Sequence, residues 1–223
     1  MFFRFALLSA TVFVSARAAP AQIEGHIYYI PSGSMEPTLR VNDRIWASPV
    51  PYRKADPKRG DIAIMELPLA LVNPESGKGM TSYVKRVVGV PGDRVELVNR
   101  VLKINGQPQK EPFVLWRNEA IPGLSSKESV FRYDMKVIHG LVFSRSYDDD
   151  GRPGSWWRND VVAPEQDQAF ISRTPTEPLP PGKFLVLGDH RSNSNDSHVF
   201  GLVDRSRFKA KVTLRLYPQA RTF

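Results

Sequence analysis

Short runs of aliphatic and β-branched residues, separated by residues that favour turns, dominate this chain after residue 20. The clearest case is Val95–Gly106, in which Asn99-Arg100 and Asn105-Gly106 divide the apolar runs. Asn and Gly readily take the positive φ angles that two-residue hairpin turns need, so this stretch predicts antiparallel strands. The sequence therefore predicts a mainly β fold built on antiparallel sheet.

Further runs along the chain fit the same pattern, and no long amphipathic helix pattern follows the N-terminus. We expect strands over the ranges 44–47, 61–66, 83–90, 94–98, 101–104, 137–144, 168–171, 184–187 and 210–216.

The middle of the chain differs in composition from both ends. Residues from about 107 to 180 are rich in Pro, Trp, Ser and Asp, which indicates an insertion. We expect a core of antiparallel sheet made of residues 21–105 and 181–223, with a smaller β-rich cap subdomain inserted at 106–180. A short hydrophobic segment at 1–20 precedes the core.

The hydrophobic segment carries an apolar run from Phe5 to Ala16, which is 12 residues long. A full membrane span needs about 20 residues. Two interpretations stay open: a minimal anchor lengthened by neighbouring residues, or a cleavable signal peptide with Ala16-Arg17-Ala18 as its small-residue cleavage site. Both interpretations place the rest of the chain outside the cytoplasm.

Composition excludes several classes of protein. The chain has no cysteine, and none of its four histidines has metal-ligand spacing, so we expect neither a thiol nucleophile nor a metal or other cofactor. The net charge of +8 comes from scattered Lys and Arg without a nucleic-acid-binding motif. Anionic lipid headgroups are therefore the expected partner of this charge, and nucleic acid is not.

The candidate nucleophile lies in the run Ile30–Leu39, which reads Ile-Pro-Ser-Gly-Ser-Met-Glu-Pro-Thr-Leu. Pro31 and Pro37 restrict the backbone on both sides, and Gly33 lets the chain bend beside Ser34. A hydroxyl on a stiff turn suits a nucleophile, provided that a neighbouring group takes its proton.

The candidate base is Lys85, which lies 51 residues further along the chain. A lysine accepts a proton only when neutral, and burial lowers its pKa by disfavouring the ammonium form. A fall from about 10.4 to near 8 requires roughly 3 kcal/mol. In a strand, Lys85 points to the same side as Tyr83 and Val87 and away from Arg86, so Lys85 is the lysine expected to face the apolar side.

Two further segments complete a set of four that follow in order: Arg59–Ile64 and Leu187–Gly201. With them the chain resembles the type I signal peptidases, which are membrane-anchored serine proteases with a Ser/Lys dyad. The similarity covers residues 30–105 and 183–212, and it favours a membrane anchor for the N-terminal segment.

The resemblance implies roles for particular residues. Ser34 matches the nucleophile and Lys85 the general base of acylation and deacylation, while Ser32 and the Ser34 backbone N–H match the oxyanion hole. Ser194 matches the serine that orients the lysine, and Asp196 matches the aspartate that steadies this loop. The residues expected to support the base and the loop are Ser194, Asp196, His198, Asp189 and Arg191.

The chain departs from the family pattern at two positions in this loop. His190 stands where the family has Asn, and His198 stands where it has Arg. The Asp196–His198 pair would be an ion pair only when the histidine is protonated, so activity would depend on acid. A second mechanism stays open, in which His190 or His198 with an aspartate activates Ser34 as a conventional triad.

The resemblance also implies the substrate and the location. Type I signal peptidases cleave secretory preproteins after Ala-x-Ala sites, bind them as extended strands, and lie in the bacterial plasma membrane with one span and an extracytoplasmic catalytic domain. Trp46, Trp156 and Trp157 are candidates for a membrane-facing rim or for the core. The alternatives are a pilin-processing peptidase dedicated to one substrate, and an inactive exported β module.

Overall fold

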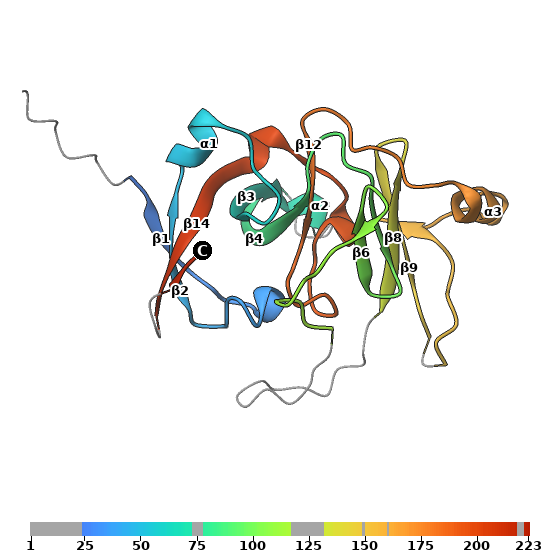
Figure 1. The fold of residues 1–223 in the computed structure, drawn as a ribbon, viewed down its shortest axis with the longest axis horizontal. Helices are drawn as coiled ribbons and strands as arrows, with labels where there is room; N and C mark the ends of the chain where they lie inside the picture. Colours follow the sequence, from blue (N-terminus) through green and yellow to red (C-terminus); the bar gives the residue numbers. More distant parts are fainter. Residues whose placement is uncertain (1–23, 73–77, 117–131, 149, 160, 218–220) are drawn as a thin grey trace, which may run out of the picture.

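The computed structural model describes residues 24–72, 78–116, 132–148, 150–159, 161–217 and 221–223. Two sheets lie side by side in it, and every pairing between their strands is antiparallel (Figure 1). The prediction of a mainly β, antiparallel fold is confirmed. The N-terminal segment 1–20 lies outside the described residues.

The first sheet has eight strands in the order β1-β2-β14-β3-β4-β12-β13, with β15 paired to β14. Its strands are β1 (His26–Tyr29), β2 (Arg44–Ser48), β3 (Ile62–Pro68), β4 (Met80–Gly89), β12 (Lys183–Leu187), β13 (Val203–Asp204), β14 (Phe208–Tyr217) and β15 (Arg221–Thr222).

The second sheet has seven strands in the order β11-β10-β9-β8-β5-β6-β7. Its strands are β5 (Val95–Val98), β6 (Val101–Ile104), β7 (Gln107–Pro108), β8 (Tyr133–Ile138), β9 (Leu141–Ser146), β10 (Trp157–Arg158) and β11 (Val161–Val162).

The helices are short. They are η1 (Gly33–Met35), α1 (Val50–Lys54), α2 (Leu69–Val72), α3 (Glu165–Arg173), α4 (Ser197–Phe200) and η3 (Arg205–Arg207). Within the described ranges, none is both long enough and apolar enough to cross a bilayer.

Two-residue turns with positive φ angles build the second sheet, as the sequence predicts for two of them. Asn99 and Arg100 have φ values of 49° and 65° between β5 and β6, and Asn105 and Gly106 have values of 53° and 78° between β6 and β7. Left-handed residues at both turn positions match the right-handed twist of the paired strands.

The predicted strand over 137–144 is wrong in its extent. His139 and Gly140, with φ values of 51° and 72°, form a third hairpin turn, and they divide this range between β8 and β9. The apolar run continues on both sides of the turn, so the alternation of residues alone does not reveal the break.

The predicted strand over 168–171 is also wrong, because these residues belong to helix α3. Pro164 precedes the helix, and Glu165 and Asp167 lie in its first turn, where acidic side chains favour the positive end of the helix dipole. Arg173 lies in the last turn, where a basic side chain is favoured. The helix signals were present at its ends, whereas the central apolar residues suggested a strand.

The core joins the two sheets. Side chains of β4 and β12 pack against those of β5, β6, β8 and β9 in one cluster, which includes Val88, Leu185, Leu97, Leu102 and Met135. β3 lies inside the first sheet and is buried on both faces, which explains its nearly continuous apolar sequence. The site described below therefore lies on strands whose side chains pack into the core.

The strands of the second sheet begin before the expected insertion. β5 and β6 pair within this sheet, although they precede residue 106. The division into 21–105, 106–180 and 181–223 stays a prediction, and a subdomain that begins near residue 95 matches the pairing better.

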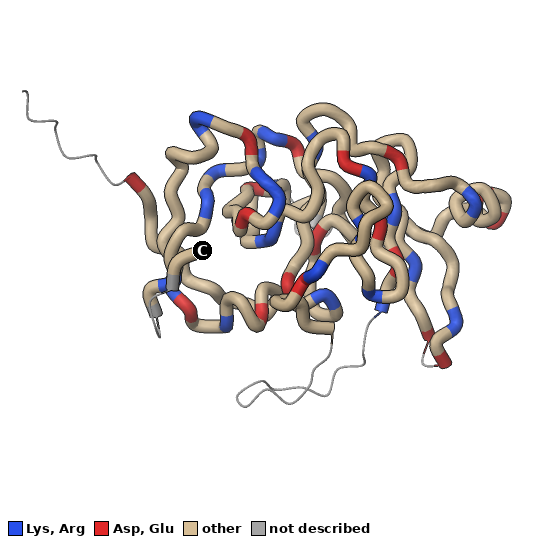
Figure 2. The backbone as a smooth tube through the Cα atoms, viewed as in Figure 1, with Lys and Arg blue, Asp and Glu red and all other residues tan. Residues whose placement is uncertain are grey.

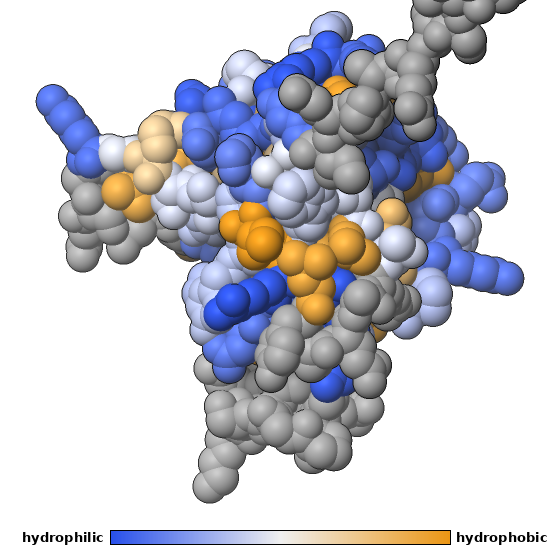
Figure 3. Space-filling view, turned by 90° about the vertical axis from the view of Figure 1, so that its left-hand side faces the viewer, coloured by the Kyte–Doolittle hydropathy of each residue, from blue (hydrophilic) through white to orange (hydrophobic). Residues whose placement is uncertain are grey.

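Charged and apolar residues are distributed differently over the surface. Lys and Arg are interspersed with Asp and Glu along both sheets (Figure 2). Apolar side chains gather on the face of the molecule that carries β1, β2 and β14 (Figure 3). The exposed large apolar residues of the first sheet and its helices include Ile27, Tyr29, Met80, Leu71 and Leu216.

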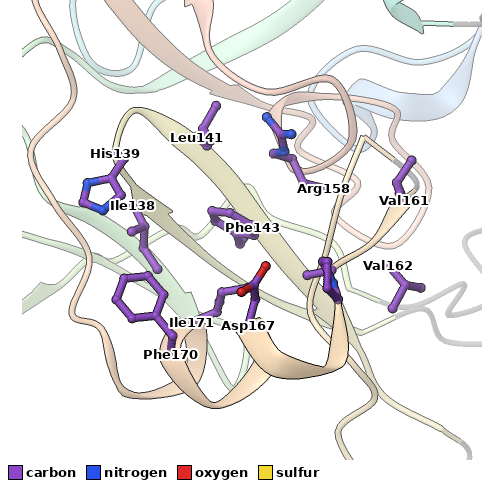
Figure 4. Close-up of a pocket in the computed structure, with 12 residues that line it drawn as sticks. Ile138, His139, Leu141, Phe143, Arg158, Val161, Val162, Asp167, Phe170 and Ile171 are labelled. Atoms are coloured by element: carbon purple, nitrogen blue, oxygen red, sulfur yellow. The ribbon is translucent and has the colours of Figure 1, made fainter.

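An apolar cavity of about 350 Å³ lies between α3 and the hairpin of β8 and β9 (Figure 4). Ile138 and Phe143 of the hairpin face Phe170 and Ile171 of the helix across it. Beside this cavity, Ile171 of the helix packs with Ile138 and Trp156 in a buried cluster.

Candidate active site

Ser34 lies at the centre of the 3₁₀ turn η1, between the two prolines that the sequence singles out. The turn is closed by the Glu36 backbone N–H, which donates to the Gly33 carbonyl. A Cβ atom at Gly33 would come within 2.9 Å of the Glu36 carboxylate, so the end of this side chain packs directly against the turn. The His190 backbone N–H donates to the Ser34 carbonyl at 3.2 Å and ties the turn to the loop after β12.

Lys85 lies on β4 opposite Ala63 of β3, and it is buried with 3% of its surface exposed. Its Nζ donates a hydrogen bond to Ser34 Oγ at 2.7 Å. Burial lowers the pKa of Lys85 to about 8, although Asp196 and Asp189 oppose this effect. The amine is therefore neutral far more often near neutral pH than a surface lysine.

The loop after β12 is held to β4 by Asp189, which is fully buried. Arg86 donates two hydrogen bonds to its carboxylate, at 2.8 and 2.6 Å, and Thr38 donates a third. Arg86 points away from Lys85, as strand alternation predicts. This bidentate pair fixes the loop to the strand that carries the lysine.

Arg191 is fully buried and binds Glu111 through two hydrogen bonds of 3.1 and 2.6 Å. Close by, Leu115 forms a parallel bridge with His190. A segment that follows β7 thus lies against the loop. The sequence analysis did not predict Glu111 or Leu115, since nothing local indicates a pairing across so many residues.

Asp196 is buried at the N-terminus of α4, where it accepts hydrogen bonds from Gly188 N–H at 2.8 Å and from His198 N–H at 3.2 Å. His198 Nδ1 lies 2.8 Å from the same carboxylate, and its ring stacks on Tyr133 of β8. Burial alone would raise the pKa of Asp196, yet His198 and the Gly188 N–H together lower it below 3.8.

Ser194 and Ser32 lie beside this arrangement. A Cβ atom at Gly188 would collide with Ser194 Oγ and with the Ser34 carbonyl, so Ser194 and the η1 turn both pack closely on Gly188. Ser32 precedes η1 in an extended conformation and is exposed to the cavity next to Ser34.

The cavity beside Ser34 and Lys85 has a volume of about 660 Å³. Its walls come from β1, η1 and β4 and from two Asn residues of the loop after β12. The lining residues include Tyr28, Ile30, Met35, Thr81, Tyr83, Val84, Asn193 and Asn195. The Ser34 and Lys85 side chains are therefore both reached from an open, partly apolar hollow.

The structure places the two histidines of the loop beside carboxylates. Ser34 Oγ is hydrogen bonded to Lys85, whereas His198 contacts Asp196 and His190 lies 4.0 Å from Glu36. The arrangement therefore favours Lys85 over a histidine as the partner of the serine.

Trp156, a candidate for a membrane rim, is buried, while Trp46 and Trp157 are partly buried.

A mainly β chain that holds a serine hydroxyl against a buried amine, in the wall of an open cavity, has the architecture of a serine hydrolase. The chain belongs to the signal peptidase family, peptidase S26, whose sequence model matches residues 2–217.

Relatives of the same kind are similar over most of their length. Signal peptidase IB of Staphylococcus aureus (strain COL) is 30% identical over 191 residues, which cover 86% of this chain and 77% of that protein. Signal peptidase I of Leptolyngbya laminosa is 29% identical over 190 residues, covering 85% and 68%. The crystal structure of a signal peptidase I from Enterococcus faecalis V583 matches 71% of this chain and all of that chain, with 21% identity and a TM-score of 0.37.

Proposed function

We propose that this protein is a signal peptidase that removes N-terminal signal peptides from exported preproteins, with Ser34 as nucleophile and Lys85 as general base. The observation that carries the proposal is the 2.7 Å hydrogen bond between Lys85 Nζ and Ser34 Oγ, made by a lysine that is almost fully buried.

The proposed chemistry follows from the lowered pKa of Lys85. With a pKa of about 8, about one amine in ten is neutral at pH 7. The neutral amine removes the proton of Ser34 while Oγ attacks the carbonyl carbon of the scissile bond. The lysine then returns this proton to the departing amine, which leaves an ester on Ser34. The same amine then deprotonates a water molecule as it attacks the ester, and it returns this proton to Ser34 Oγ as the acyl group leaves.

The negative oxygen of each tetrahedral intermediate needs donors. We assign this role to the Ser34 backbone N–H and to the hydroxyl of Ser32, which is exposed to the cavity. One such donor typically contributes about 3 kcal/mol to transition-state stability. Asp189, Arg191, Ser194, Asp196 and His198 act in this proposal through the loop that borders the lysine.

An extended substrate suits the cavity because β4 has one free edge there. Residues Met80–Lys85 pair with β3 on one side, while β12 pairs only with the later part of β4, from Arg86 onward. Within the described ranges, no strand pairs with the other edge of Met80–Lys85. A substrate strand at this edge would present alternate side chains to the wall beside Ser34, and small residues of an Ala-x-Ala site would fit close to it.

We propose that the active site lies next to a membrane. Ile27 and Tyr29 on β1 are 60% and 55% exposed, and Met80 at the start of β4 is 49% exposed. These residues lie next to the cavity-lining Tyr28 and Thr81 in sequence, and Figure 3 shows apolar side chains gathered on the β1 face. We propose that this face contacts lipid at the extracytoplasmic side of the bacterial plasma membrane, with residues 1–20 as a single span.

Cleavage of a preprotein with an Ala-x-Ala site tests the proposal. Wild-type protein in detergent or lipid should release the signal peptide at this site, as identified by the mass of the product. Ser34→Ala and Lys85→Ala should both abolish turnover while retaining the thermal unfolding transition. Substantial cleavage by Lys85→Ala would contradict the role of the lysine.

A panel of unrelated preproteins separates the alternatives. A general signal peptidase should process most of them, whereas a peptidase dedicated to pilin-type substrates should process one class alone. An inactive binding module should process none, at any pH up to about 9, where the neutral lysine predominates.

A further inference from the structure

A second pair of titratable side chains lies behind the nucleophile turn. Glu36 and His190 are both buried, with 4% and 0% of their surfaces exposed, and Glu36 Oε2 lies 4.0 Å from His190 Nδ1. Glu36 Oε2 accepts no hydrogen bond from the described part of the chain. A buried carboxylate oxygen without a donor is costly unless an opposite charge lies nearby.

Glu36 and His190 each contact the turn that carries Ser34. The Glu36 carboxylate packs on Gly33, since a Cβ atom there would be 2.9 Å from Oε2. The backbone N–H of His190 donates to the carbonyl of Ser34 at 3.2 Å. A change in either side chain would therefore be transmitted directly to the residues that flank the Ser34 backbone.

The neighbouring charges are already paired with other groups. Asp189 is bound by Arg86, and Arg191 is bound by Glu111. His190 Nδ1 lies within ion-pair distance of the Glu36 carboxylate, whose charge the ring opposes when it is protonated. An unbalanced negative charge behind Gly33 would repel the oxyanion that the proposed reaction forms at the Ser34 N–H, because Coulomb interactions are strong in buried surroundings.

We propose that Glu36 and His190 are positioning residues that hold the Ser32–Ser34 turn as a charge-balanced pair, in which His190 cancels the charge of Glu36 beside the oxyanion site. The proposal rests on the proposed function of Ser34. It adds a role for His190, which stands at the position where the family pattern has Asn, and it links this residue to Glu36.

Three variants test the pair: His190→Asn, Glu36→Gln and the double variant. His190→Asn leaves the carboxylate unbalanced and should lower kcat at least about tenfold, with KM within about twofold of wild type. Glu36→Gln should lower kcat less than about threefold. The double variant should recover the kcat of Glu36→Gln, because no charge then remains to be cancelled.

Two outcomes would overturn the proposal. Either kcat is unchanged in His190→Asn, or its loss persists in full in the double variant, as expected if the imidazole has only a packing role. If His190→Asn does not fold, thermal unfolding of the double variant decides: a cooperative transition and activity near Glu36→Gln support the pair, and an unfolded double variant contradicts it.

A second measurement separates this proposal from the choice of substrate. The rate at which a small fluorophosphonate modifies Ser34, followed by intact mass, reports serine reactivity without a preprotein. As for kcat, His190→Asn should slow this modification, Glu36→Gln should change it little, and the double variant should recover the rate of Glu36→Gln. A protein that reacts in this way but cleaves no preprotein would contradict the proposed function while supporting the pair.

Discussion

At the scale of single residues, burial of one lysine both enables the proposed chemistry and lowers stability. Lys85 is 3% exposed, and its pKa falls to about 8 from an ordinary value of 10.5. Because the pKa in the folded state lies below that in the unfolded state, the cost to folding is complete below pH 8 and disappears as the pH rises toward 10.5. Near neutral pH this cost reaches about 3 kcal/mol.

Replacement of Lys85 by Met should therefore raise the free energy of unfolding at pH 7, by up to about 3 kcal/mol, while abolishing cleavage. Urea unfolding at pH 7 and at pH 10.5 measures the difference, which should shrink at the higher pH. Lys209→Met is the matched control, because Lys209 is exposed and should show no such gain. A Lys85→Met protein less stable than wild type at pH 7 would contradict the account.

At the scale of elements, the turn of helix α4 links the lysine to the second sheet. Asp196 caps this helix and accepts a hydrogen bond from the Gly188 N–H. Its carboxylate also contacts His198, whose ring stacks on Tyr133 of β8. One buried carboxylate thus joins the loop after β12 to both sheets. Its pKa lies below 3.8 despite burial, because the folded loop stabilises its charged form.

Asp196→Asn should destabilise the protein by about 1 to 3 kcal/mol at neutral pH. The neutral amide has only one oxygen to accept hydrogen bonds from the Gly188 N–H, the His198 N–H and His198 Nδ1. A carboxyl whose pKa is lower in the folded state stabilises the fold at pH values above its pKa in the unfolded state. This contribution is lost as the pH falls through its pKa in the folded state. The difference between wild type and variant should therefore be constant above pH 5 and narrow below 3.8. Asp150→Asn, at an exposed ion pair, is the control.

Urea unfolding over a series of pH values gives this comparison. If the difference between wild type and Asp196→Asn grew on acidification, the charged form of Asp196 would not be the stabilising one.

At the scale of the whole molecule, exposed apolar residues occur at two distant places. Ile27 and Met80 lie on the first sheet near the cavity, and Val161 and Val162 lie on β11 at the edge of the second sheet. The four side chains are between 49% and 69% exposed. Only the first pair lies next to the proposed active site, so the two pairs form a matched comparison.

The double variant Ile27→Ser and Met80→Ser should weaken binding to anionic lipid vesicles by at least about tenfold, because each side chain loses its transfer from water to lipid. It should also raise KM for a preprotein in vesicles while leaving kcat on a short soluble peptide unchanged. Val161→Ser with Val162→Ser should change neither. Equal losses in both double variants, by vesicle sedimentation, would argue against a specific membrane face.

Features that depend on neighbouring residues could be predicted from the sequence, whereas contacts between distant segments could not. Strands such as 101–104 and the Asn-Gly turn after them are local, and the sequence predicts them correctly. The break at His139-Gly140 and helix α3 were missed because apolar residues near both suit a strand as well. Lys85 could be predicted to face inward from alternation, but its contact with Ser34 depends on how distant strands pair.

The supporting residues show the same limit. Asp196 and Ser194 could be located through the resemblance of their loop to the family pattern, whereas Glu111 reaches Arg191 through a non-local pairing that no local pattern indicates. Glu36 lies within the predicted nucleophile segment, yet its proximity to His190 becomes visible only when η1 and the loop after β12 are seen together.

The pH dependence of kcat/KM for cleavage of an Ala-x-Ala preprotein tests most directly whether a neutral Lys85 activates Ser34. The rate constant should rise about tenfold per pH unit in the acidic range and level off near the pKa of about 8. The variants His190→Asn and His198→Asn should keep this break at the same pH. A rise that instead levels off near the ordinary histidine pKa of about 6.5, and that is lost in His198→Asn, would contradict a lysine base.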